Sequence, residues 1–134
     1  AECKMLLNRS GKNPLDSVNC IVSKNEFLEM QSEVQNVFVS DDMARYIVSL
    51  ISATRKHPLL SRGASPRATL SLTDMAKAVA FAEGRDYIVP RDVQNIFICT
   101  VNHRIILNAK ASASKKNSEE ILHEILRKTP KPRT

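Results

Sequence analysis

Apolar residues recur at intervals of three and four, between signals that start and stop helices. The clearest run follows Ser40, a residue type that caps helices well. Asp41 and Asp42 come next, where negative charge suits the positive end of the helix dipole. The apolar stripe consists of Met43, Tyr46, Ile47, Leu50 and Ile51, and the run closes at Arg55-Lys56-His57 before Pro58. This pattern predicts a helix with one buried face.

The same signals predict four further helices. Capping boxes open the first and the last, at Ser23 with Glu26 and at Asn117 with Glu120. Another helix runs from Pro66 to about Glu83, where Gly84 suits a left-handed end, and another begins at Pro90. The residues expected on the inner faces are Phe27, Met30, Val34 and Val37; Ala68, Leu72, Met75, Ala76, Val79 and Ala80; Val93, Ile96, Phe97 and Val101; and Ile121, Leu122, Ile125 and Leu126. With extended residues 85–89 and a small-residue linker at 109–114, we expect an all-α bundle of about five helices.

The composition suits closely packed helices in one small domain. Hydrophobic residues make up 43% of the 134 residues, but aromatic residues only 4%, so the core is expected to be aliphatic and rich in alanine. No stretch approaches the ~20 apolar residues of a membrane span, and residues 1–25 do not resemble a signal peptide. Cys3, Cys20 and Cys99 are widely spaced, so we expect free thiols and a cytoplasmic protein.

The run from Gly63 to Ala68 places a cation at a helix start. Ser65 suits the N-cap and Pro66 the first helical position, so Arg67 lands in the first turn. There it faces the positive end of the helix dipole, which is unfavourable by roughly 0.3–1 kcal/mol. A bound phosphate would remove the conflict, because a helix N-terminus beside a guanidinium favours anions. The alternative is an exposed arginine that is solvated by water.

Gly63-Ala64-Ser65-Pro66-Arg67-Ala68 resembles the second-sensor motif of the MoxR-type AAA+ ATPases, in the carboxy-terminal helical lid domain. The resemblance covers nearly the whole chain and includes Asn13-Pro14-Leu15-Asp16-Ser17-Val18, Tyr46-Ile47-Val48, Ala53-Thr54-Arg55, the run from Glu83 to Val93, His103-Arg104 and the run from Glu120 to Leu126. It implies that Arg67 is catalytic and reaches the nucleotide phosphates. It also implies that Gly63, Ala64, Ser65 and Pro66 form the nucleotide-binding segment with it.

The chain lacks the other parts of a nucleotide site. No glycine-rich loop ends in Gly-Lys-Ser/Thr, and no apolar strand ends in an acidic pair for Mg²⁺. The resemblance therefore implies residues 1–22 as a linker from a P-loop domain, 23–109 as the lid, and 110–134 as a basic linker and C-terminal helix. ATP and Mg²⁺ would bind in the full-length parent, an ATPase of chaperone-like type, and this part alone is not expected to be active. Neighbouring subunits in a ring, expected to be a hexamer, and a von Willebrand factor A-domain protein are the implied partners.

Two other classes of function stay open. One is a free-standing helical adaptor that binds a protein partner through an apolar groove. The other is a basic helical module that binds nucleic acid. The net charge of +6 divides unevenly, with +2 in residues 1–109 and +4 in residues 110–134, and no aromatic platform accompanies the tail. Nucleic-acid binding is therefore expected less than the other functions.

Several other polar residues are expected to be structural. His57, His103 and His123 have no ligands at metal spacing, so no metal site is expected. Asp41 and Asp42 suit helix capping better than acid–base catalysis. Arg104 is expected to pair with a buried carboxylate or to extend to solvent. Arg62 and Arg85 lie near opposite ends of the helix after Pro66, so only Arg62 is a second candidate for phosphate binding.

Overall fold

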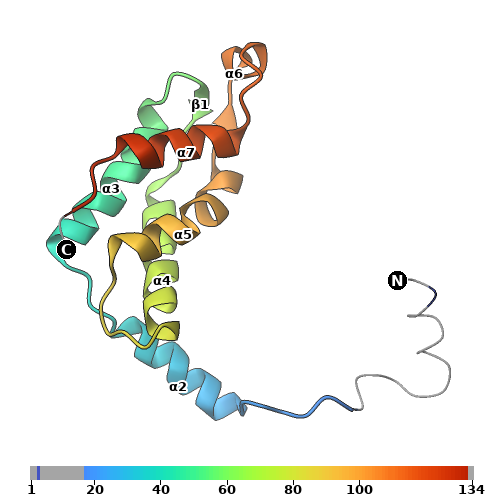
Figure 1. Ribbon diagram of the computed structural model, residues 1–134, viewed down its shortest axis with the longest axis vertical. Helices are drawn as coiled ribbons and strands as arrows, with labels where there is room; N and C mark the ends of the chain where they lie inside the picture. Colours follow the sequence, from blue (N-terminus) through green and yellow to red (C-terminus); the bar gives the residue numbers. More distant parts are fainter. Residues whose placement is uncertain (1–2, 4–16, 133–134) are drawn as a thin grey trace. The chain divides into compact units, whose positions relative to one another are not determined.

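The structure is a computed structural model that describes Cys3 and residues 17–132 (Figure 1). The chain divides into two compact units, Ala1–Gln31 and Ser32–Thr134. The described helices and strands are α2 (Lys24–Gln35), α3 (Asp41–Lys56), β1 (Leu60–Arg62), α4 (Pro66–Ala82), α5 (Pro90–Val101), the 3₁₀ helix η2 (Asn102–Arg104), β2 (Ile106–Leu107), α6 (Ala109–Ala113) and α7 (Ser118–Lys128). Most of the predicted linker at 1–22, including Asn13 to Asp16, lies outside the described residues.

Helix α2 begins as predicted but does not bury the predicted face. The Ser23 N–H donates to Glu26 Oε2 at 2.7 Å, and the Glu26 N–H donates to Ser23 Oγ at 3.2 Å. Phe27 is 55% exposed and Met30 is 41% exposed, whereas Val37, just beyond the helix, is buried. Periodicity indicates which residues share a face, but not whether another element covers it. The expectation that Phe27 and Met30 lie in the core is therefore wrong.

Helices α3, α4 and α5 build the core of the second unit. The whole predicted stripe of α3, from Met43 to Ile51, is buried, and the helix ends at Lys56 with His57 as its C-cap, as predicted. Helix α4 lies against α5 and α3, and its buried side carries Ala68, Ala76 and Ala80, all fully buried. Alanines leave room for the backbones to approach, so a core with few aromatic residues still fills its space. Met75 was expected on this side, but it is 48% exposed.

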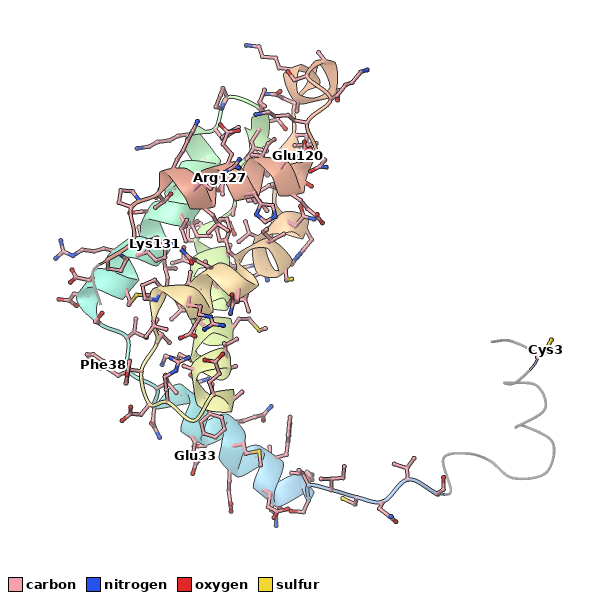
Figure 2. All side chains as sticks on the ribbon, viewed as in Figure 1. Cys3, Glu33, Phe38, Glu120, Arg127 and Lys131 are labelled. Atoms are coloured by element: carbon pink, nitrogen blue, oxygen red, sulfur yellow. The ribbon has the colours of Figure 1, made fainter. Side chains whose placement is uncertain are left out.

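Helix α7 closes the second unit against α3 and α5 (Figure 1). Its predicted capping box is present, since the Asn117 N–H donates to Glu120 and the Glu120 N–H donates to Asn117. Glu120 lies in the first turn and Arg127 in the last, the charge order that suits the helix dipole (Figure 2). Its buried residues are Ile121, Leu122 and Ile125.

Two features between α3 and α7 differ from the expectation. Strands β1 and β2 form a two-stranded antiparallel sheet in which Leu60 pairs with Leu107. Residues 109–113, expected as a linker, form helix α6, because the Asn108 side chain accepts the Ala111 N–H and Ala111 is fully buried. The predicted all-α bundle is confirmed, with this small sheet and the additional short helix.

Candidate functional site at the start of helix α4

The sequence predicts the start of helix α4 correctly, except for its cap. Ser65 occupies the N-cap with extended backbone angles, and Pro66 takes the first helical position. The Ser65 hydroxyl was expected to cap the helix, but it makes no capping hydrogen bond. Instead, the Ala68 N–H donates to the Ser65 backbone carbonyl at 2.9 Å, so a tight backbone turn replaces the side-chain cap. Ser65, Pro66 and Arg67 are all exposed.

The electrostatics of this helix start are unusual among the longer helices. Helices α2, α3, α5 and α7 each carry an acidic residue in the first turn, whereas α4 carries none. Arg67 makes no ion pair with any residue in the described ranges. Among the described residues, the exposed first turn of α4 therefore combines the positive end of the helix dipole with the charge of Arg67 and has no acidic partner. This arrangement suits a ligand with a negative charge.

The loop before Arg67 is tightly fixed to the carboxyl end of α3. The Ala64 N–H donates to Thr54 Oγ1 at 2.9 Å, and Arg55 Nε donates to the Ala64 carbonyl at 2.7 Å. Ala64 and Thr54 are fully buried. A Cβ atom at Gly63 would lie 2.5 Å from the Cα and N atoms of Arg55, so only glycine fits without a shift of the backbone. Through Gly63 and Ala64, the backbone just before α4 is thus held against the carboxyl end of α3.

Arg62 and Arg104, the other two arginines considered for this site, have different surroundings. Arg62 is an exposed residue of β1, opposite Ile106 of β2. Arg104 was expected to pair with a buried carboxylate or to extend to solvent; it is half-buried, and its Nε donates to His103 Nε2 at 3.1 Å. Both arginines form no ion pair in the described part of the chain. Arg104 and His103 line a hollow of about 420 Å³ together with Ser71, Asp74, Met75, Cys99 and Thr100.

Arg85 has a structural role at the other end of α4. Its guanidinium donates to both carboxylate oxygens of Asp92 at 2.7 and 2.8 Å, and to Glu83 at 2.7 Å. These hydrogen bonds, those to Asp92 first, raise the pKa of Arg85. Asp92 is fully buried and also accepts the Val89 N–H at 2.8 Å. Arg85 therefore neutralises a buried carboxylate at the start of α5.

Glu124 and His57 are two further titratable groups with shifted pKa values. Hydrogen bonds from Lys116 and Lys128, at 2.7 Å each, lower the pKa of Glu124 to about 2, so two cations of the basic tail are already paired. Burial lowers the pKa of His57. In the described residues, no three His, Cys, Asp or Glu side chains gather as a metal site would require, and Cys3, Cys20 and Cys99 are free and exposed.

The family model of the AAA lid domain matches residues 52–125, more than half of the chain. The chain belongs to this family. The chaperone MoxR1 of Mycobacterium tuberculosis is 30% identical over 140 residues, which cover 98% of this chain and 37% of that protein. YeaC of Bacillus subtilis is 34% identical over 125 residues, which cover 93% of this chain and 39% of that protein. The expected MoxR-type AAA+ lid is thus confirmed.

A solved structure agrees with the family. A crystal structure from Cytophaga hutchinsonii, described provisionally as that of an ATPase, has a TM-score of 0.86 and 35% identity to this AAA lid domain. The match covers 98% of this chain and 42% of that one. The chain thus spans about two fifths of the length of these relatives. Within the described ranges of this lid domain, every helix is too short or too polar to cross a membrane.

Proposed function

We propose that this lid domain supplies Arg67 to ATP that is bound, with Mg²⁺, by a P-loop domain of the same protein. The observation that carries the proposal is the exposed helix start where Arg67 has no acidic partner in the described residues. Its guanidinium offers a planar fork of donors that matches phosphate oxygens. The fully buried Ala64 and the close contact at Gly63 hold the backbone before it in one place.

The chemistry follows from where negative charge develops in phosphoryl transfer. A guanidinium beside the γ-phosphate stabilises the charge of the transition state, and its contribution is larger there than in the ground state. Because the contact requires the γ-phosphate, it weakens after hydrolysis, and the lid is free to move. The lid would convert cleavage of the phosphate into a rigid-body motion. In a ring of subunits, expected to be a hexamer, this motion would drive chaperone-like work on client proteins.

The test uses the ATPase that contains this chain, with substitutions at Arg67. Arg67→Ala should lower kcat for ATP hydrolysis by about 10²-fold, because an aligned charge donor is lost from the transition state. Arg67→Lys should recover only part of the rate, because an ammonium group lacks the planar fork. The matched control is Arg91→Ala, an exposed arginine that follows a proline in the first turn of α5, which should leave kcat nearly unchanged. Normal turnover by the Arg67→Ala protein would contradict the proposal.

The two other classes of function predict different results. A helical adaptor would function without ATP, so Arg67 substitutions would not change its binding to a partner protein. A nucleic-acid module would depend on the tail at 110–134, where Lys116 and Lys128 already pair with Glu124. The logarithm of its affinity would fall with the logarithm of the salt concentration, with a slope set by the number of phosphates contacted. The adaptor class does not explain why Arg67 has no acidic partner in the described residues.

A further inference from the structure

The carboxyl end of α3 holds both polar backbone groups of one residue, Ala64. Thr54 Oγ1 accepts the Ala64 N–H at 2.9 Å and donates to the Ile51 carbonyl at 2.6 Å. Arg55 Nε donates to the Ala64 carbonyl at 2.7 Å. The backbone of Arg55 also lies so close to Gly63 that a Cβ atom would not fit between them. Two hydrogen bonds to Ala64 and a close backbone contact at Gly63 therefore hold this loop against α3.

Only two residues, Ser65 and Pro66, separate Ala64 from Arg67, and their backbone is restricted. Ala64 is followed directly by Ser65, the N-cap, and by Pro66, whose ring restricts the backbone angle φ. The Ala68 N–H then closes the first turn on the Ser65 carbonyl. A shift of Ala64 would thus move the start of α4 and the guanidinium of Arg67 with it.

We propose that Arg55 is a positioning residue for Arg67. Its hydrogen bond to the Ala64 carbonyl joins the end of α3 to the start of α4, so that both move as one body when the lid moves. The inference rests on the proposed function of Arg67. Arg55 is itself exposed and charged, so the competing explanation is that its guanidinium contacts the nucleotide directly.

Two substitutions separate positioning from direct contact. In Arg55→Gln, the side-chain nitrogen occupies the same place along the chain as Nε of arginine, so the hydrogen bond can persist without the charge. In Arg55→Lys, the methylene group Cε takes the place of Nε, and the charged Nζ lies one atom beyond it. If Arg55 positions the loop, the Gln variant retains more activity than the Lys variant. If Arg55 contacts phosphate, the order is reversed, and the inference is overturned.

The experiment measures kcat and KM for ATP in the ATPase that contains this chain. Arg55→Ala should lower kcat by about 10- to 100-fold, because a small displacement of an aligned group has an effect of that order, and KM should change less. Arg45→Ala is the matched control, since Arg45 is an exposed arginine on the same helix. If Arg55→Ala leaves kcat unchanged, the inference is wrong. If that variant does not fold, as shown by thermal unfolding, the Gln and Lys variants decide.

A double substitution distinguishes this inference from the proposed function. In an Arg67→Ala background, Arg55→Ala should lower kcat little further, because the group that Arg55 positions is already gone. Fully additive losses would overturn the positioning role while leaving the role of Arg67 intact. If Arg67→Ala alone has no effect on kcat, the proposed function fails, and this inference fails with it.

Discussion

A substitution at Arg67 is predicted to separate the stability of the domain from its proposed function. Arg67 is exposed, lies at the positive end of α4 and has no acidic partner in the described residues. Removing its charge in this 134-residue chain should leave the free energy of unfolding unchanged or raise it by about 0.3–1 kcal/mol. Denaturation of the Arg67→Ala chain by urea would measure this. A clear loss of stability would identify Arg67 as a structural residue instead.

Gly63 is predicted to be the most sensitive residue of the loop. A Cβ atom there would meet backbone atoms of Arg55 and Thr54 at 2.5–2.6 Å, and backbone atoms cannot rotate away. Gly63→Ala should therefore lower the free energy of unfolding by about 1–3 kcal/mol, as overpacking does in cores. Gly84→Ala is the comparison, because its space is open and only its positive φ of 73° is unfavourable, by about 1 kcal/mol. Equal losses of stability would mean that the loop can shift away from α3.

The exposed residues of the candidate site could be predicted from the sequence, but the buried contacts that hold them in place could not. Ser65, Pro66 and Arg67 follow local rules for helix starts, so their places were predictable. Thr54 and Arg55 contact Ala64 from ten and nine residues away, and local rules do not reach that far. Their only signal was Ala53-Thr54-Arg55 in the family resemblance, which gave no role. The predicted side-chain cap at Ser65 is wrong, because the Ala68 N–H bonds to the backbone carbonyl of Ser65 instead.

At the level of elements, the predicted helices were those with local start and stop signals. Helices α3 and α7 carry N-cap side chains that bond as the sequence indicates. Strands β1 and β2 could not be predicted, because each is short and its partner lies more than forty residues away in the chain. Helix α6 was missed because a run of small residues has no apolar periodicity.

The junction between α4 and α5 contains an ion pair between Arg85 and the buried Asp92. Val89 lacks a capping side chain, and Asp92 satisfies the Val89 N–H from inside the helix while Arg85 neutralises its buried carboxylate. Arg85→Ala should lower the free energy of unfolding by about 3 kcal/mol, because a buried carboxylate loses its partner. Arg91→Ala, at an exposed arginine of the same junction, should have little effect. Thermal unfolding of both variants is the measurement, and equal stabilities would show that Asp92 tolerates the loss.

Taken as a whole, this lid domain contains one residue that we propose to contact phosphate, and its 134 residues lack the other parts of an ATP site. Arg67 lies in the first turn of α4 in the second unit, after a loop that is fixed to α3. A glycine-rich loop for the phosphates and an acidic pair for Mg²⁺ are absent from the 134 residues. A single arginine can stabilise charge in the transition state, but it cannot orient both the nucleotide and the attacking water.

The 134-residue chain alone is therefore predicted not to hydrolyse ATP. Release of inorganic phosphate from ATP and Mg²⁺ should stay at the background rate, and the Arg67→Ala chain, purified in the same way, is the control. Turnover that persists in the control would come from a contaminating enzyme, because the proposed contact is missing there. Turnover that disappears in the control would show that the chain holds a complete catalytic site around Arg67. That result would contradict the proposal that a P-loop domain binds ATP and that this lid domain contacts the γ-phosphate.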